Sequence, residues 1–166
     1  MTIILFMVLV QEFIKEHKTT PQLTISTNSQ YLDLCEYLQK ELEKIGIQVA
    51  IDVMPPSTLR QMKNTGELAL FRGSWVADYP DAENYLCLFY SPNKSPEGAN
   101  RTRYKNKEVD ALFDLSKEVT DTERMRLYHK MDSIIVSDAP IVPLFYKESL
   151  SLVHNKVKGL KFNAMK

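Results

Sequence analysis

The segment of residues 71–91, FRGSWVADYPDAENYLCLFYS, concentrates aromatic and acidic side chains that could hold a charged ligand. It contains the chain's only tryptophan, Trp75, and Asp78 follows in the same loop-like stretch. A carboxylate beside a tryptophan ring suits a ligand that carries a cation, because charge pairing and cation–π attraction then act on the same group. The α-amino group of a peptide is such a cation, and capture of chain termini is a recurring mode of peptide recognition. We therefore predict that Trp75 and Asp78 bind a ligand.

Other side chains of this segment have simpler structural interpretations. Tyr85, Leu86 and Phe89 are spaced like the buried face of a helix, which favours a place in the core. Asp81 suits the N-cap of that helix. Arg72 could face a carboxylate of the ligand, and an ion pair on the surface or between lobes is the simpler alternative.

The carboxylates of Asp78, Asp81 and Glu83 are also the groups that glycoside hydrolysis or calcium binding would use. Their spacing does not match an EF-hand. The sequence contains no Gly-x-Ser-x-Gly, no HExxH and no glycine-rich phosphate loop. No nucleophile–base pair is evident, so we predict that the chain is not an enzyme and uses no cofactor.

The charge of the chain is balanced, with 21 basic and 21 acidic residues among 166 and a formal net charge of zero. This argues against nucleic acid as the main partner, because phosphate contacts need an excess of Lys and Arg on one face. Basic clusters at 101–107 and 156–161 are interpreted as solvated surface. The length is sufficient for a buried core.

Neither the cysteines nor the histidines predict a metal site. Cys35 and Cys87 lie far apart and outside any C-x-x-C, so one disulfide is possible but the spacing does not show it. Cys35 falls in a helical apolar pattern, where we expect it to act as a small buried hydrophobe. His17, His129 and His154 show no mutual ligand spacing.

The elements that must position the segment 71–91 alternate between strand and helix. The patterns predict a strand at 23–27, a helix from Ser29 to a glycine cap at Gly46, a strand at 47–53, a helix at 56–64 and a strand at 67–75. This order is typical of an α/β layer with a mostly parallel or mixed sheet. Ligand sites in such sheets gather at the carboxyl ends of strands, and residues 75–81 follow one such end.

The rest of the chain is predicted to be mainly helical. The patterns indicate a helix from Asp81, a loop at 91–104, helices at 107–117 and 121–137, a strand-like segment at 141–153 and a turn at 154–155. The second of these long helices should begin with a capping box between Thr120 and Glu123.

The N-terminus carries an apolar run, residues 3–10, that is too short to span a bilayer. It is similar to the core of a signal peptide but lacks a basic start and a small-residue cleavage site. The alternative is a strand or helix that packs against another part of a larger protein. A short helix is predicted at 11–18.

Three motifs resemble one known family. GSWVADYPDAENYLCLFYS is similar to the GW-x-x-DYPDP-x-N-F/Y-L segment of the oligopeptide- and dipeptide-binding proteins of ABC importers, an extracytoplasmic solute-binding family that also includes nickel binders. The stretch 31–51, which contains LQKELEKIGIQV, and the stretch 104–146, which contains VDALF and IVPLFY, resemble that family in the same order. The likeness extends from Leu23 to the C-terminus.

The resemblance implies a periplasmic-binding-protein-like lobe of class α/β, with a mixed sheet flanked by helices. The family encloses an extended peptide between two lobes and delivers it to a membrane permease. Carried onto this chain, Asp78 pairs with the α-amino group of the ligand, Trp75 and Tyr79 form walls, and Gly73 and Ser74 contact the peptide backbone. Because some members bind nickel-type ligands, the ligand class stays open.

The sequence departs from the family pattern at Ala82 and Ser74, but Asp78, the proposed anchor of the α-amino group, matches the pattern. The larger departure is length, since family members are much longer. We expect residues 1–20 to be an uncertain N-terminal segment, 21–140 a second-lobe ligand-binding domain, and 141–166 a terminal strand segment that in the family returns to the first lobe. The resemblance implies a periplasmic or extracytoplasmic location.

On this expectation the chain is a truncated product or a fragment of a longer reading frame. It would be the second lobe of a peptide importer's binding component. The alternative is a non-binding structural remnant or a partner-interaction fragment, which could form a homo-oligomer through the exposed face of the lobe.

Overall fold

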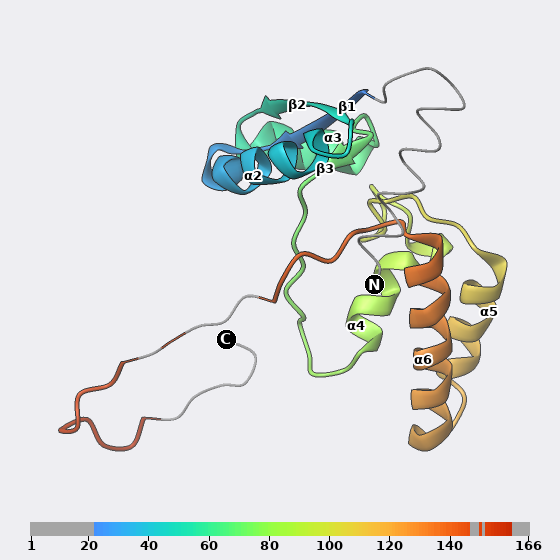
Figure 1. Cartoon of the computed structure of the whole chain (residues 1–166). Helices are drawn as coiled ribbons and strands as arrows, with labels where there is room; N and C mark the ends of the chain where they lie inside the picture. The colour runs from blue at the N-terminus through green and yellow to red at the C-terminus, as the bar shows by residue number, and fades with distance from the viewer. Residues whose placement is uncertain (1–21, 147–149, 151, 161–166) are drawn as a thin grey trace. The chain divides into compact units, whose positions relative to one another are not determined.

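The computed structural model describes residues 22–146, 150 and 152–160 (Figure 1). The chain divides into two compact units, Met1–Ser74 (unit 1) and Trp75–Lys166 (unit 2), and each has its own hydrophobic core. The apolar run at 3–10 and the helix predicted at 11–18 lie outside the described residues. Across the described ranges, every helix is too short or too polar to cross a bilayer.

Unit 1 is built on a three-stranded sheet. β1 (Gln22–Thr27) lies in the centre, between β2 (Gln48–Val53) and β3 (Leu70–Phe71). Both pairings are parallel: β1 follows β2 along its whole length but meets β3 at only two positions. The predicted α/β class is confirmed, and every pairing among the described strands is parallel.

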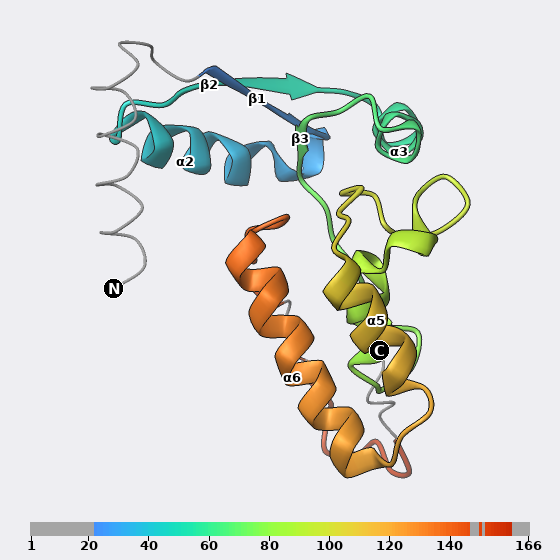
Figure 2. The ribbon, with the colours of Figure 1, turned by 90° about the vertical axis from the view of Figure 1, so that its right-hand side faces the viewer.

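One face of this sheet is covered by α2 (Leu32–Glu43), which follows the short 3-10 helix η1 (Ser29–Tyr31) (Figure 2). The shared core consists of Ile25, Cys35, Ile45, Ile47 and Val49. Cys35 is fully buried, which confirms its predicted role as a small hydrophobe.

The end of α2 is shaped by Gly46, whose φ of 89° places it in the left-handed region. This conformation lets the amide of Ile47 donate to the carbonyl of Leu42 at 3.1 Å and turns the chain into β2. The predicted glycine cap is therefore confirmed. α3 (Pro56–Thr65) then begins at the predicted proline pair.

Unit 2 is helical in the residues described. α4 (Glu83–Leu86) continues as the 3-10 helix η2 (Cys87–Phe89), and η3 (Ser91–Asn93) follows. The two predicted long helices are present as α5 (Lys107–Ser116) and α6 (Asp121–Asp138), which pack side by side (Figures 1 and 2). The core between these elements consists of Leu86, Phe89, Val109, Phe113, Tyr128, Met131 and Ile135.

The loop at 91–104 is organised by the side chain of Asn100, which is fully buried. Its amide nitrogen donates to the carbonyl oxygens of Tyr90 at 3.2 Å and Tyr104 at 3.0 Å. Its amide oxygen accepts from the hydroxyl of Thr102 at 3.0 Å. The loop predicted from composition is thus held by internal hydrogen bonds as well as by its ends.

The strand predicted at 67–75 is much shorter in the structure, where only Leu70–Phe71 pair with β1. The amide of Arg72 still donates to the carbonyl of Ser26 at 3.0 Å. β1 ends at Thr27, so the residues after Arg72 have no strand beside them with which to continue the ladder.

The core prediction for the segment 71–91 is correct for Leu86 and Phe89, each of which is 7% exposed, and wrong for Tyr85, which is 44% exposed. The reason is the shortness of α4. After four residues the chain passes into a 3-10 helix with three residues per turn, so a period of 3.6 no longer selects one face.

The capping box predicted between Thr120 and Glu123 is wrong. Thr120 occupies the N-cap of α6, but its side chain makes no capping hydrogen bond. The carboxylate of Glu123 instead pairs with Arg126 at 3.5 Å. A cation one turn away therefore competes with the backbone amide for the same carboxylate.

The strand-like segment predicted at 141–153 forms no strand in its described residues, 141–146, 150 and 152–153. A strand is stabilised by a hydrogen-bonded neighbour, and the described residues provide none for this segment. The turn that follows is confirmed, since the amide of Val157 donates to the carbonyl of His154 at 2.9 Å.

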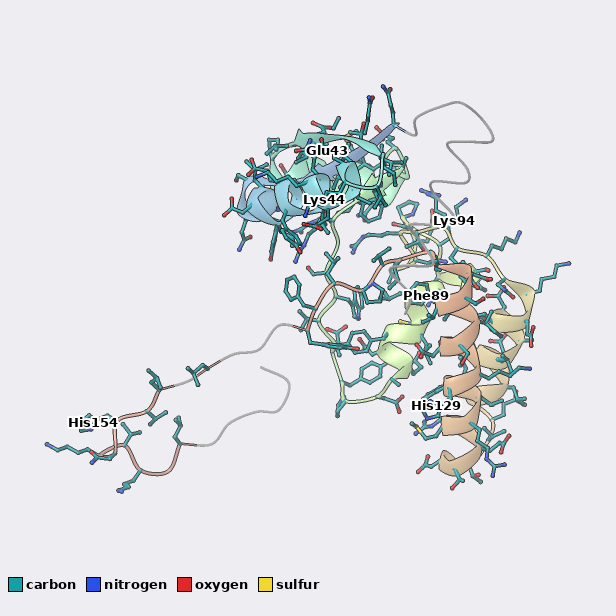
Figure 3. All side chains as sticks on the ribbon, viewed as in Figure 1. Glu43, Lys44, Phe89, Lys94, His129 and His154 are labelled. Atoms are coloured by element: carbon teal, nitrogen blue, oxygen red, sulfur yellow. The ribbon has the colours of Figure 1, made fainter. Side chains whose placement is uncertain are left out.

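Cys35 and Cys87 are both free thiols, so the possible disulfide is not formed. Burial is the main reason that the pKa of the Cys87 thiol is raised. His129 lies on α6 and His154 in the terminal turn (Figure 3). In the described ranges, no group of His, Cys, Asp and Glu could hold a metal ion.

Candidate functional site

Trp75 and Asp78 lie in the irregular segment that leads into α4, and one buried side chain connects them. The amide oxygen of Asn84 accepts from the indole Nε1 of Trp75 at 2.8 Å and from the backbone amide of Asp78 at 3.3 Å. Asn84 is 3% exposed, whereas Trp75 is half-buried and Asp78 is exposed. The structure thus brings the predicted aromatic ring and the predicted anionic residue onto one support.

The carboxylate of Asp78 is available to a ligand. It takes part in no ion pair among the residues that the structure describes. Tyr79 is 44% exposed, and its hydroxyl donates to the carboxylate of Glu83. This hydrogen bond is the main cause of the raised pKa of Tyr79.

The start of α4 is fixed by Asp81. One carboxylate oxygen accepts from the amide of Glu83 at 2.9 Å, so Asp81 caps the helix as predicted, although the N-cap position itself is Ala82. The other oxygen pairs with Arg124 of α6 at 3.3 Å. Burial, together with a hydrogen bond to Asp81, raises the pKa of Tyr128 to about 12.

Arg72 lies near the end of unit 1 and packs on an aromatic ring. Its guanidinium carbon lies 3.3 Å from the ring centroid of Tyr31, a cation–π contact. Its Nη1 donates to the hydroxyl of Ser74 at 3.4 Å. Tyr31 follows the carboxyl end of β1 as Arg72 follows that of β3, so the parallel sheet brings the two side chains together.

Gly73 is exposed and has room for a side chain. A β-carbon at this position would approach no atom closer than Cε2 of Phe71, at 3.8 Å, which is ordinary van der Waals contact. The fold of unit 1 therefore does not by itself require glycine at position 73.

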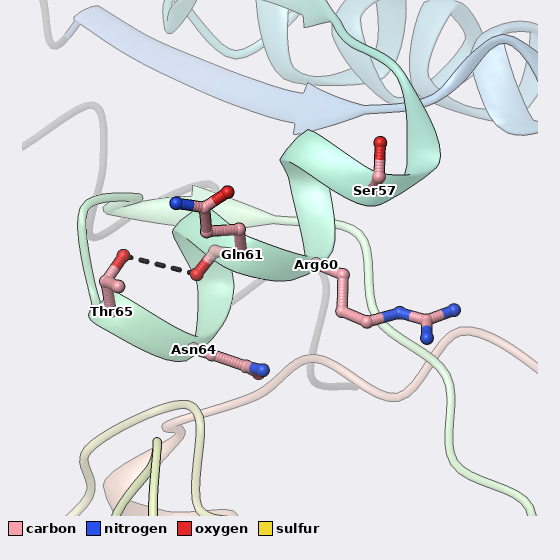
Figure 4. Close-up of a pocket in the computed structure, with 5 residues that line it drawn as sticks. All are labelled: Ser57, Arg60, Gln61, Asn64 and Thr65. Atoms are coloured by element: carbon pink, nitrogen blue, oxygen red, sulfur yellow. Dashed lines mark hydrogen bonds between the residues drawn. The ribbon is translucent and has the colours of Figure 1, made fainter.

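Two surface pockets are formed by described residues of unit 1. One is formed by α3 alone and is lined by Ser57, Arg60, Gln61, Asn64 and Thr65 (Figure 4). The other runs along β1 and the segment before β3. Neither pocket is lined by any of the six residues predicted to bind the ligand.

The six predicted residues divide at the boundary between the units. Arg72, Gly73 and Ser74 end unit 1, and Trp75, Asp78 and Tyr79 begin unit 2. Within unit 1 the structure joins Arg72 to Ser74, and within unit 2 it joins Trp75 to Asp78 through Asn84.

Sequence reasoning missed three supporting residues: Asn84, Tyr31 and Arg124. A signal existed for Asn84, because it stands at the asparagine of the DYPDP-x-N motif. Arg124 stands at the arginine of an R-x-x-LY pattern in the stretch 104–146 that resembles the family, whereas no comparable pattern marks Tyr31.

The comparison with known proteins identifies the family of this chain. The family described as "Bacterial extracellular solute-binding proteins, family 5 Middle" matches residues 9–97, which include the segment from Arg72 to Asn84. The chain belongs to this family. The resemblance predicted from the three motifs is therefore confirmed, and the relatives are binding proteins, in agreement with the prediction that the chain is not an enzyme.

Among the curated relatives of this family 5 chain is the "Probable D,D-dipeptide-binding periplasmic protein DdpA" of Escherichia coli (strain K12), 32% identical over 128 residues, which are 76% of this chain and 25% of the relative. The "Probable deoxycholate-binding periplasmic protein YgiS" of the same organism is 33% identical over 74% of this chain and 22% of its own length. The chain spans about a quarter of the length of the curated relatives it matches.

A solved structure confirms the fold of this family 5 chain. The "ABC transporter-associated periplasmic binding protein DppA from Helicobacter pylori in complex with peptide STSA" is similar with a TM-score of 0.73 and 31% identity, over 81% of this chain and 27% of that protein. The predicted periplasmic-binding-protein-like fold is therefore confirmed.

Proposed function

We propose that this chain is part of the substrate-binding component of an ABC importer for peptides, and that Asp78 pairs with the α-amino group of the ligand. One observation carries the proposal: the Trp75 indole and the Asp78 backbone are both hydrogen-bonded to the Asn84 oxygen. This arrangement ties an aromatic ring and the backbone of Asp78 to one oxygen, and the Asp78 carboxylate takes part in no ion pair among the described residues. An ammonium group can interact with both the ring and the carboxylate.

The family relationship supports the ligand class and the place of action. One solved relative holds a peptide, and a curated relative is named for D,D-dipeptides. Both are periplasmic, so we propose an extracytoplasmic location and a membrane permease as the partner. Arg72, Gly73, Ser74 and Tyr79 remain proposed ligand contacts, with Arg72 as a counter-charge for a ligand carboxylate.

The domain division is also a proposal. It assigns residues 1–20 to an uncertain N-terminal segment, 21–140 to a second-lobe ligand-binding domain, and 141–166 to a terminal strand segment that in the family returns to the first lobe. Its support is the exposure of large apolar side chains in that segment: Val142 is 78% exposed, Tyr146 92% and Leu152 90%. Such side chains favour an alternative role, contact with a partner protein or a second copy. A clean monomer in size-exclusion chromatography would count against this alternative.

The ligand test uses the single tryptophan as its reporter. A tripeptide with a free amino terminus should change the fluorescence of Trp75, and the same tripeptide with an acetylated terminus should not. Deoxycholate is the comparison ligand, because a relative of similar identity is named for it and it carries no amine. A response to deoxycholate but to neither peptide would overturn the peptide proposal, and equal responses to both peptides would overturn the amine anchor.

Replacing Gly73 by Ala is expected to lower peptide affinity about tenfold while leaving unit 1 folded. The added methyl group fits the free protein, since its nearest neighbour would be 3.8 Å away. It would, however, occupy the space that a peptide backbone needs for close approach. Isothermal titration calorimetry gives the affinity and thermal unfolding gives the stability. Unchanged affinity would remove Gly73 from the proposed ligand contacts.

A further inference from the structure

We infer that Asn84 is the positioning residue of the anchor: a single amide oxygen orients the Trp75 ring and fixes the backbone at Asp78. The expected effect of Asn84 on peptide binding rests on the proposed function. The geometry itself belongs to unit 2 and is present without a ligand.

The chemistry of the three groups dictates this orientation of the side chain. An indole N–H and a backbone N–H can only donate, so an amide flipped by 180° would face both with its own N–H₂ group. A carbonyl oxygen has two lone pairs and can accept from both donors at once. The hydrogen bond from the Trp75 indole has an ordinary length of 2.8 Å, and the one from the Asp78 backbone is longer, at 3.3 Å.

Asn84 is itself held firmly. The backbone amide of Asn84 donates to the backbone carbonyl of Asp81 at 3.1 Å, and the backbone carbonyl of Asn84 accepts from the Cys87 thiol at 3.3 Å. Asp81 is tied to Arg124 of α6 at 3.3 Å, and Arg124 also pairs with Asp121 at 3.1 Å. A chain of contacts therefore leads from the long helix α6 to the first turn of α4 and on to the ring of Trp75.

The two hydrogen bonds act outside the core. The core of unit 2 contains neither Trp75 nor Asp78, and the Asn84 acceptor bonds to that segment. Loss of the acceptor should therefore release the Trp75–Asp78 segment and leave the packing of α5 on α6 in place.

The test measures the indole N–H of Trp75 directly. Because the chain has one tryptophan, its indole gives one side-chain cross-peak in a ¹⁵N-correlated NMR spectrum, and hydrogen exchange of that proton reports the bond to Asn84. In Asn84→Leu, which keeps the number and branching of the side-chain heavy atoms and removes the acceptor, we expect exchange about tenfold faster and peptide affinity about tenfold weaker. In Asn84→Asp, which keeps an acceptor oxygen, slow exchange should be restored.

The matched control is Asn93→Leu. Asn93 lies in the same unit and its side-chain amide donates to the carbonyl of Cys87 at 3.0 Å, whereas the indole of Trp75 donates to Asn84. In this variant we expect the indole proton of Trp75 to exchange at the wild-type rate. Equal exchange in Asn84→Leu and the wild type, or an equal acceleration in Asn93→Leu, would overturn the inference.

Two further outcomes separate this inference from the proposed function. If Asn84→Leu does not fold, Asn84→Asp decides, and fast indole exchange in a folded Asn84→Asp chain would overturn the positioning role. If the indole behaves as expected but no tripeptide binds the wild-type chain, Asn84 still positions Trp75 and the peptide proposal alone fails.

Discussion

Replacing Asp78 by Asn is expected to abolish the peptide-induced change in Trp75 fluorescence. The substitution keeps the size of the side chain and the backbone amide that bonds to Asn84, but removes the charge that pairs with the ligand's ammonium group. If the bound site excludes water, an unpaired buried ammonium costs about 3–5 kcal/mol, a loss of affinity on the order of 10² to 10³. Fluorescence titration with a free-amine tripeptide measures this loss.

The size of the loss is informative. An ion pair that remains solvated contributes only about 0–1 kcal/mol, so a loss below about tenfold would mean that the site does not exclude water. Asp132→Asn is the control, because Asp132 is exposed on α6 and its replacement changes the net charge by the same amount. Undiminished affinity in Asp78→Asn, or an equal loss in Asp132→Asn, would contradict the anchor role.

Replacing Asn100 by Ala is expected to be the most destabilising polar substitution in unit 2. The side chain is fully buried and satisfies the carbonyls of Tyr90 and Tyr104 and the hydroxyl of Thr102. Each buried polar group left without a partner costs about 1–3 kcal/mol, so we expect a loss of about 2–4 kcal/mol in the free energy of unfolding. Denaturant unfolding followed by circular dichroism measures it.

The control for this substitution is Asn155→Ala, at an exposed position in the terminal turn. Its effect should stay within about 0.5 kcal/mol, as for most surface substitutions. A similarly small effect of Asn100→Ala would show that water replaces the lost amide in the loop. That result would contradict the role of Asn100 as the organiser of the loop.

Local patterns predicted the elements whose stabilising contacts are close in sequence. The apolar period around Cys35 and the glycine at Gly46 are sufficient to place α2, its end and the next strand. The strand predicted at 67–75 shows where this fails. Alternation of apolar and polar residues along one strand does not show how many residues of the neighbouring strand pair with it, and β1 pairs with β3 at only two positions.

The sequence predicted the residues proposed to face the ligand, but it did not predict the residues that hold them in place. Trp75 and Asp78 draw attention because an aromatic ring and an acid in a loop lack an obvious packing role. Arg124 lies in a stretch that resembles the family, but its contact with Asp81 at 3.3 Å arises only from the packing of α4 on α6. Contacts of this kind depend on tertiary structure and leave no periodic trace.

The central position of β1 in a parallel sheet has a consequence for the order of folding. Among the described strands of unit 1, β1 is the first to leave the ribosome, yet both of its neighbours are made later, and β3 is the last. Parallel pairing between distant segments is slow, because chain entropy is lost before the ladder forms. We therefore expect the hydrogen bond from Arg72 to Ser26, at the far end of the β3 ladder, to be among the last bonds of this sheet to form.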